Sequence, residues 1–154
     1  PFAGRRYRAG RAVTDASSDR IHATCVAIGG QAVLLCGRSG SGKSDLALRL
    51  IDRGAELVAD DQVLLVRDGD TVRAAPPVAI AGKIEVRGLG ILAMAHRTAM
   101  PVAMIFQLDE PVERLPLEAT RRLLVGIALP VVAVAPFEAS APIKIELALR
   151  KFGR

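Results

Sequence analysis

Apolar and polar positions along the chain predict short strands interrupted by few helices. Residues 21–28 and 31–36 are apolar runs, the first rich in β-branched side chains, and the glycine pair at 29–30 between them is typical of a two-residue hairpin. Leucines then recur at helical spacing over residues 43–53, and Gly54 follows as a stop signal. The first third of the chain therefore predicts a β-hairpin that leads into one amphipathic helix.

The rest of the chain continues the same pattern. Apolar runs predict further strands at 55–59, 62–67, 71–75, 102–108 and 129–134, with 62–67 and 71–75 forming a hairpin. Residues 84–92 read as half strand and half glycine-hinged loop, whereas 117–124 fit either a strand or a helix. Residues 140–151 predict a closing helix with Ser140 as its N-cap. Because hairpins are frequent, we expect an α/β domain with a mixed β-sheet rather than regular βαβ units.

Length and composition fit one globular domain. The chain has 154 residues, of which 51% are hydrophobic, and its formal charge is +5. Four arginines crowd the first eleven positions, so we interpret residues 1–20 as a basic, disordered leader and residues 21–154 as the domain. Such a leader could contact nucleic acid or an acidic partner, but only 3% of residues are aromatic, which argues against a base-stacking protein.

The two cysteines and the apolar runs bear on compartment. Cys25 and Cys36 lack the spacing of a metal site, and we interpret them as reduced core thiols, which favours the cytoplasm. No apolar stretch reaches the roughly 20 residues of a spanning helix. We therefore expect no contact with a membrane.

The strongest chemical signal is the octapeptide GRSGSGKS, which has the spacing of a Walker A phosphate loop (P-loop) between a strand and a helix. In such a loop, glycines let backbone N–H groups surround phosphate oxygens, and the helix adds its N-terminal dipole. The lysine supplies a point charge and the last serine can ligate Mg²⁺. We therefore expect nucleotide binding by Gly37, Arg38, Ser39, Gly40, Ser41, Gly42, Lys43 and Ser44.

An acidic pair, Asp60-Asp61, closes the next apolar strand. One carboxylate there resembles the Walker B position, which holds Mg²⁺ directly or through water. The second could take a proton from an attacking hydroxyl, since crowding of like charges raises the pKa of one member of such a pair. The alternative is a plain Asp turn that opens the following hairpin.

Three further residues have two readings each. Glu85 is either an additional Mg²⁺ group or part of a solvated strand face. His22, in an apolar run ahead of the P-loop, is either a core residue or part of the site. Arg114 follows an acidic stretch, so it either forms a surface ion pair or stabilises the charge of a transferred phosphoryl group.

Together these motifs resemble the catalytic domain of bacterial HPr kinase/phosphorylase. The resemblance covers most of residues 21–151 and includes IHA at 21–23, GRSGSGKSDLAL at 37–48, LVADD at 57–61 and IEVRGLGIL at 84–92. It implies a short form that holds only the catalytic C-terminal domain, with a P-loop kinase fold similar to the nucleotide domain of phosphoenolpyruvate carboxykinase. It also implies a hexamer that uses ATP and Mg²⁺ to phosphorylate a serine of HPr, the small phosphocarrier of the sugar phosphotransferase system.

The same resemblance implies a role for each candidate residue. Lys43 would act on the phosphoryl group, Ser44 and Glu85 would hold Mg²⁺, and Asp61 would exchange the serine proton. Asp60 would support the metal or its neighbour, and the resemblance makes His22 and Arg114 active-site residues.

One departure from the family concerns the reverse reaction, phosphorolysis of seryl-phosphorylated HPr. The family has an arginine- and glycine-rich loop before the last helix, whereas residues 134–140 here contain no arginine. Two alternatives to an HPr kinase also stay open: a small-molecule P-loop kinase, and a nucleotide-binding regulatory module that does not transfer phosphate.

Overall fold

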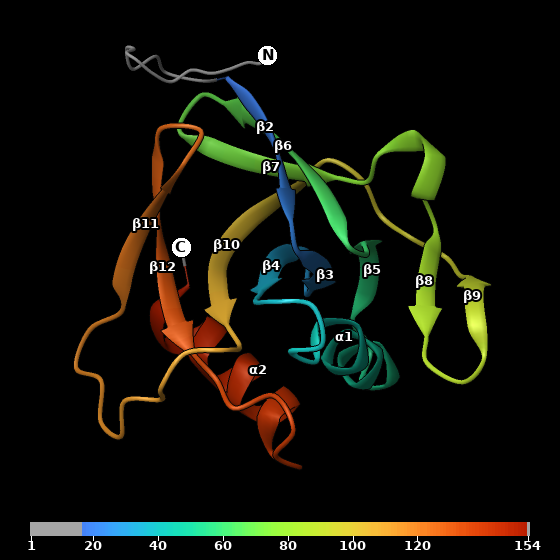
Figure 1. Ribbon diagram of the computed structural model, residues 1–154. Helices are drawn as coiled ribbons and strands as arrows, with labels where there is room; N and C mark the ends of the chain where they lie inside the picture. Colours follow the sequence, from blue (N-terminus) through green and yellow to red (C-terminus); the bar gives the residue numbers. More distant parts are fainter. Residues whose placement is uncertain (1–16, 154) are drawn as a thin grey trace.

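The computed structural model describes residues 17–153 of the chain, which form a curled mixed sheet with two helices (Figure 1). Most of the leader expected over residues 1–20 lies outside the described residues, but its last three residues belong to a strand. The elements are β2 (Ser18–His22), β3 (Thr24–Ile28), β4 (Gln31–Cys36), α1 (Lys43–Asp52), β5 (Glu56–Ala59), β6 (Gln62–Asp68), β7 (Thr71–Ala75), η1 (Val78–Ile80), β8 (Lys83–Val86), β9 (Gly90–Ala93), β10 (Met100–Gln107), β11 (Thr120–Leu124), β12 (Ile127–Ala133) and α2 (Ala141–Phe152).

Within residues 17–153 the large sheet has nine strands, in the order β2-β6-β7-β10-β4-β3-β5, with β12 and then β11 branching from β10. Strand β10 runs parallel to β4 and β12, and the other pairs are antiparallel, which confirms the expected mixed sheet. The segment 84–92, expected as half loop, is instead within a two-stranded hairpin of β8 and β9. The ambiguous segment at 117–124 forms β11, because it pairs along its length with β12.

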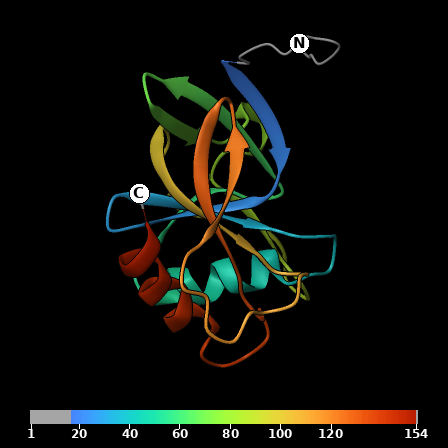
Figure 2. The ribbon, with the colours of Figure 1, turned by 90° about the vertical axis from the view of Figure 1, so that its left-hand side faces the viewer.

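Two buried clusters lie on the two faces of the central strands, because side chains alternate along a strand. On one face, Val33 and Leu35 of β4 pack with Leu46 and Leu50 of α1 and with α2. On the other face, Leu34 packs against residues of β6, β7 and β12, since the sheet curls over this side. Figure 2 shows both helices side by side under the sheet, and Arg53, directly after α1, bonds Glu146 of α2 at 2.7 Å.

The apolar run at 21–28, expected as one strand, is two strands that separate at Ala23. β2 pairs with β6, whereas β3 pairs with β4 and β5. The run crosses from one part of the curled sheet to the other, and the sequence does not mark this point because no glycine or proline interrupts the run at Ala23.

Both cysteines are free thiols, as expected. Burial raises the pKa of Cys25 and of Cys36. Among the described residues, no helix is long and apolar enough to cross a membrane.

Candidate active site

The P-loop connects the end of β4 to the start of α1, as its sequence predicts. Gly42 adopts φ 97° directly before the helix, a backbone conformation that favours glycine. Gly37 is required for a different reason: a Cβ there would lie 2.5 Å from Oγ of Ser41. The Ser41 hydroxyl is itself buried and has no hydrogen-bond partner among the described residues. The loop is therefore a tight cradle in which the Gly37 backbone passes close to the Ser41 side chain.

Lys43 lies inside this cradle and is only 7% exposed. Its ammonium group donates to the carbonyl oxygens of Gly37 at 2.8 Å and of Arg38 at 2.9 Å. A charge held at the mouth of the loop by backbone carbonyls is well placed to interact with an outer phosphate.

Two chain crossings bring the remaining site residues together. The chain passes between parts of the sheet at Ala23 and again at Asp60-Asp61, and the N–H of Ala23 donates to the carbonyl of Asp61 at 3.2 Å. The crossings therefore lie side by side, and Asp60 in the second one accepts the hydroxyl of Ser44 at the start of α1. This arrangement places polar residues from β2, β3 and the β5–β6 connection beside the P-loop.

Asp60 is the buried carboxylate of the site, at 6% exposed. Its Oδ1 accepts the hydroxyl of Ser44 at 2.6 Å and that of Thr24 at 3.0 Å, while its Oδ2 accepts the backbone N–H of Glu85 at 3.0 Å. Three donors from three elements fix the orientation of the carboxylate and compensate the cost of its burial.

Asp61 differs from its neighbour in both exposure and conformation. Its side chain is 68% exposed, and its Oδ1 lies 2.8 Å from Nε2 of His22. Its backbone has φ 72°, and the N–H of Gln62 donates to the carbonyl of Asp60 at 2.8 Å. Asp61 is thus the central residue of a three-residue turn of the rare positive-φ kind, which is strained.

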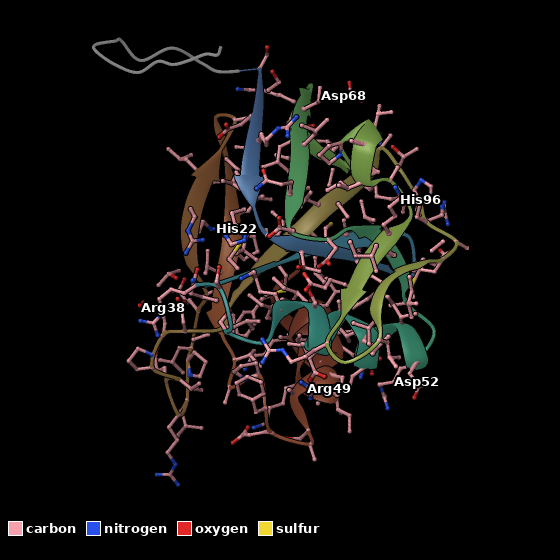
Figure 3. All side chains as sticks on the ribbon, turned by 45° about the vertical axis from the view of Figure 1, so that its right-hand side comes forward. His22, Arg38, Arg49, Asp52, Asp68 and His96 are labelled. Carbon is pink, nitrogen blue, oxygen red and sulfur yellow. The ribbon has the colours of Figure 1, made fainter. Side chains whose placement is uncertain are left out.

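A cleft of about 590 Å³ joins these groups, within the range of cofactor sites. Residues of the P-loop line it together with His22, Thr24, Asp61, Glu85 and Phe137. Figure 3 labels His22 at the end of β2 and Arg38 on the loop before α1. Of the residues expected to act, the structure brings His22, Lys43, Asp61, Ser44 and Glu85 to this one cleft, with Asp60 directly behind Ser44.

Arg114 is not among the residues that line the cleft. It lies exposed in the connection between β10 and β11, and it lines none of the other described pockets. Its catalytic role stays a prediction.

Three residues that line the cleft or bind the P-loop were not recognised from the sequence. Thr24 is, with His22, one of two polar side chains in an apolar run, and both of them line the cleft. Asp109 follows β10 and accepts the backbone N–H of Arg38 at 3.0 Å. The Gln107 amide, which donates to Asp109 at 2.6 Å, and the Arg38 N–H hold the pKa of Asp109 below its ordinary value. Phe137, the third, had no motif to mark it.

The hydrogen-bond donors and oxygen ligands of the cleft fit a triphosphate with Mg²⁺ better than a metal ion held by side chains alone. The loop supplies a glycine cradle and a helix N-terminus for phosphate. Among residues 17–153, no three His, Cys, Asp or Glu side chains are grouped to hold a metal. Mg²⁺ typically binds one or two protein oxygens plus substrate phosphates and waters, and Ser44, Asp60 and Glu85 supply oxygens of that kind.

Comparison with known proteins identifies the family. The sequence model described as the HPr Serine kinase C-terminal domain matches residues 14–148. The chain belongs to this family. In the structure of the HPr(Ser) kinase/phosphatase from Coxiella burnetii, the same fold covers 86% of this chain and 95% of that one, with a TM-score of 0.76 and 26% sequence identity. The P-loop kinase-like fold expected from the sequence is therefore confirmed.

Curated relatives of the family agree. The HPr kinase/phosphorylase of Burkholderia lata is 40% identical over 126 residues, and that of Chlorobium chlorochromatii is 39% identical over 125 residues. These matches cover 74% and 72% of this chain, but only 39% and 38% of the relatives. The chain thus spans about two fifths of the length of the curated relatives that it matches.

Proposed function

We propose that this protein is an ATP- and Mg²⁺-dependent serine kinase that phosphorylates HPr. One observation carries the proposal: the P-loop lysine and the exposed His22–Asp61 pair meet at a single cleft, with the buried Asp60 directly behind Ser44. Family membership and the names of the relatives support the choice of HPr as the acceptor.

The two carboxylates suit two different roles. Asp60 is buried and fixed by three donors, so it serves to orient the Ser44 hydroxyl and the metal site. Asp61 is exposed on the cleft, so it can reach an incoming serine. As the serine oxygen attacks the terminal phosphorus, the bond to the leaving nucleoside diphosphate breaks and Asp61 takes the serine proton. The ring of His22 holds the Asp61 carboxylate in position and stabilises it during this transfer.

The nucleotide and metal would be held by the residues already present. Backbone N–H groups of the P-loop and the Lys43 ammonium would bind the outer phosphates. The Ser44 hydroxyl would ligate Mg²⁺, and Glu85, whose N–H is tied to Asp60, would extend the oxygen donor set. Bound Mg²⁺ would neutralise charge that develops on the transferred phosphoryl group.

A phosphorylation assay with purified HPr, ATP and Mg²⁺, followed by intact mass, tests the proposal. One added phosphate on an HPr serine is the expected result. ATP binding without any labelled acceptor would instead favour the regulatory module, and phosphorylation of small metabolites alone would favour the small-molecule kinase. Adding inorganic phosphate to the phosphorylated HPr then tests the reverse reaction, for which residues 134–140 supply no arginine.

The hexamer implied by the family resemblance is part of the same proposal. Light scattering on the purified protein measures the mass of the assembly directly. A monomer of about 16.3 kDa would contradict it.

A further inference from the structure

Phe137 is an exposed aromatic side chain at one wall of the active-site cleft. It is 70% exposed, although the chain has only four phenylalanines, one tyrosine and no tryptophan. Its ring lies against the P-loop, since a Cβ on Gly42 would be 3.0 Å from the Cε1 and Cζ atoms. The ring lines the cleft and is open to solvent, so a ligand bound at the P-loop can contact it.

The backbone that carries Phe137 is fixed on both sides. The Arg49 guanidinium donates to the carbonyl oxygens of Pro136 and Glu138, and the Glu138 carboxylate bonds Lys144 of α2 at 2.7 Å. Pro136 itself is buried. The ring therefore projects from a short segment that is bonded to both helices. These bonds hold the backbone of Phe137 in place before any ligand binds.

Two adjacent faces of α1 point to different parts of the cleft: one toward the proposed Mg²⁺ ligands and one toward Phe137. Ser44 and Leu48 are four residues apart and share one face of α1, the face toward Asp60 and the β8–β9 hairpin. Asp45 and Arg49 share the adjacent face, the face toward Phe137. A triphosphate whose terminal phosphate meets Lys43 and Ser44 can thus extend its other end along the start of α1 toward the ring.

We propose that Phe137 is the platform on which the base of the nucleotide donor stacks. Any base presents a π-face to an aromatic ring, so the platform would favour nucleoside triphosphates over inorganic polyphosphates without selecting one base. This inference rests on the proposed function, because it assigns the base end of the same donor site.

Calorimetric titration of the protein with ATP and with inorganic tripolyphosphate, both with Mg²⁺, tests the platform. For Phe137→Ala we expect ATP affinity to fall about 5- to 150-fold, the range of one base–aromatic stack. Tripolyphosphate affinity should stay within about twofold, since it has no base. Phe137→Tyr should retain wild-type ATP affinity. Leu123→Ala, also at a 70% exposed apolar residue but outside the cleft, is the matched control and should change neither ligand.

Each other outcome contradicts the platform. Unchanged ATP affinity in Phe137→Ala would overturn the platform. If the KM for HPr rose in the same variant, the ring would instead contact the protein substrate. Equal losses for ATP and tripolyphosphate would show that the ring only shapes the P-loop at Gly42. A wild-type protein that binds tripolyphosphate and ATP equally well would also refute it. In all three cases transfer to HPr by the wild type would leave the kinase proposal standing, whereas a wild type that binds neither ligand would overturn both.

Discussion

Replacing Thr24 by valine removes a single hydroxyl from the support of Asp60. Thr24 is fully buried, and its Oγ1 donates to Asp60 Oδ1 at 3.0 Å. Valine has nearly the same shape and leaves no unsatisfied donor at position 24. Any loss of stability therefore comes from the Asp60 carboxylate, which loses one of its three hydrogen bonds. A hydrogen bond to a charged group contributes about 1.5–3 kcal/mol to stability. At 2–4 °C per kcal/mol for a domain of this size, we expect the Tm to fall by roughly 3–12 °C.

The same change should slow phosphoryl transfer, because Asp60 orients the Ser44 hydroxyl. A loss of about 1.4 kcal/mol in the transition state corresponds to a tenfold lower rate, so we expect kcat to fall about tenfold or more. The KM for ATP should change less, because the P-loop backbone is untouched. Thr24→Ser keeps a hydroxyl and should recover most of the rate.

Thr120→Val is the matched control for this experiment. Thr120 is also a strand threonine whose hydroxyl donates to an oxygen, the Val131 carbonyl at 3.3 Å, but it is exposed and distant from Asp60. We expect no measurable change in Tm or kcat. The reasoning is refuted if Thr24→Val melts and transfers phosphate like the wild type, or if Thr24→Ser is as impaired as Thr24→Val.

Three further substitutions probe the rest of the site. Lys43→Ala should keep the fold by circular dichroism but reduce transfer to HPr by roughly 10²–10³-fold, the usual effect of removing one charge-stabilising donor; an unfolded variant would show that the lysine is mainly structural. Asp61→Asn should retain ATP affinity by calorimetry and lose about 10²–10⁴-fold in transfer, as expected for a proton acceptor; full activity would move that role to Asp60 or remove it. The lowered pKa of Asp109 means that its carboxylate stabilises the fold above pH of about 4, and that this contribution is lost as pH falls through the folded-state pKa. Asp109→Asn should therefore lower the free energy of unfolding at pH 7, and this free energy should then fall less steeply as the pH is lowered. Urea unfolding between pH 2.5 and 7 measures both effects, and a pH profile like that of the wild type would contradict the prediction.

The parts of the site whose geometry is local could be predicted from the sequence. The P-loop is one contiguous segment, so spacing alone placed Lys43 and Ser44 correctly between a strand and α1. The carboxylate pair was found for the same reason, since Asp60 and Asp61 end one apolar strand. The amphipathic helices were also predictable, because their period of 3.6 residues is visible in the chain.

The unpredicted parts depend on pairings between distant segments. The break at Ala23 is set by distant partners, because His22 pairs with Gln62 whereas Cys25 pairs with Ala59, and the apolar run gives no sign of it. Thr24 gains its role only when this crossing meets Asp60. Phe137 reaches the P-loop because Arg49 binds the segment around it, and no periodicity in the sequence encodes that contact.

The backbone at Asp61 links the fold to the proposed chemistry. A positive φ at a residue other than glycine typically costs about 1–3 kcal/mol, and such strain persists only where surrounding contacts enforce it. Here the Ala23 N–H holds the Asp61 carbonyl while His22 holds its carboxylate. Neighbouring residues on one strand would point to opposite faces, so a regular β5–β6 connection could not present both carboxylates to one site. The tight turn removes this restriction: it leaves Asp60 buried behind Ser44 and turns Asp61 onto the cleft. The strain at Asp61 is therefore the structural cost of placing the proposed metal-side carboxylate, Asp60, and the proposed proton acceptor, Asp61, at adjacent positions in the chain.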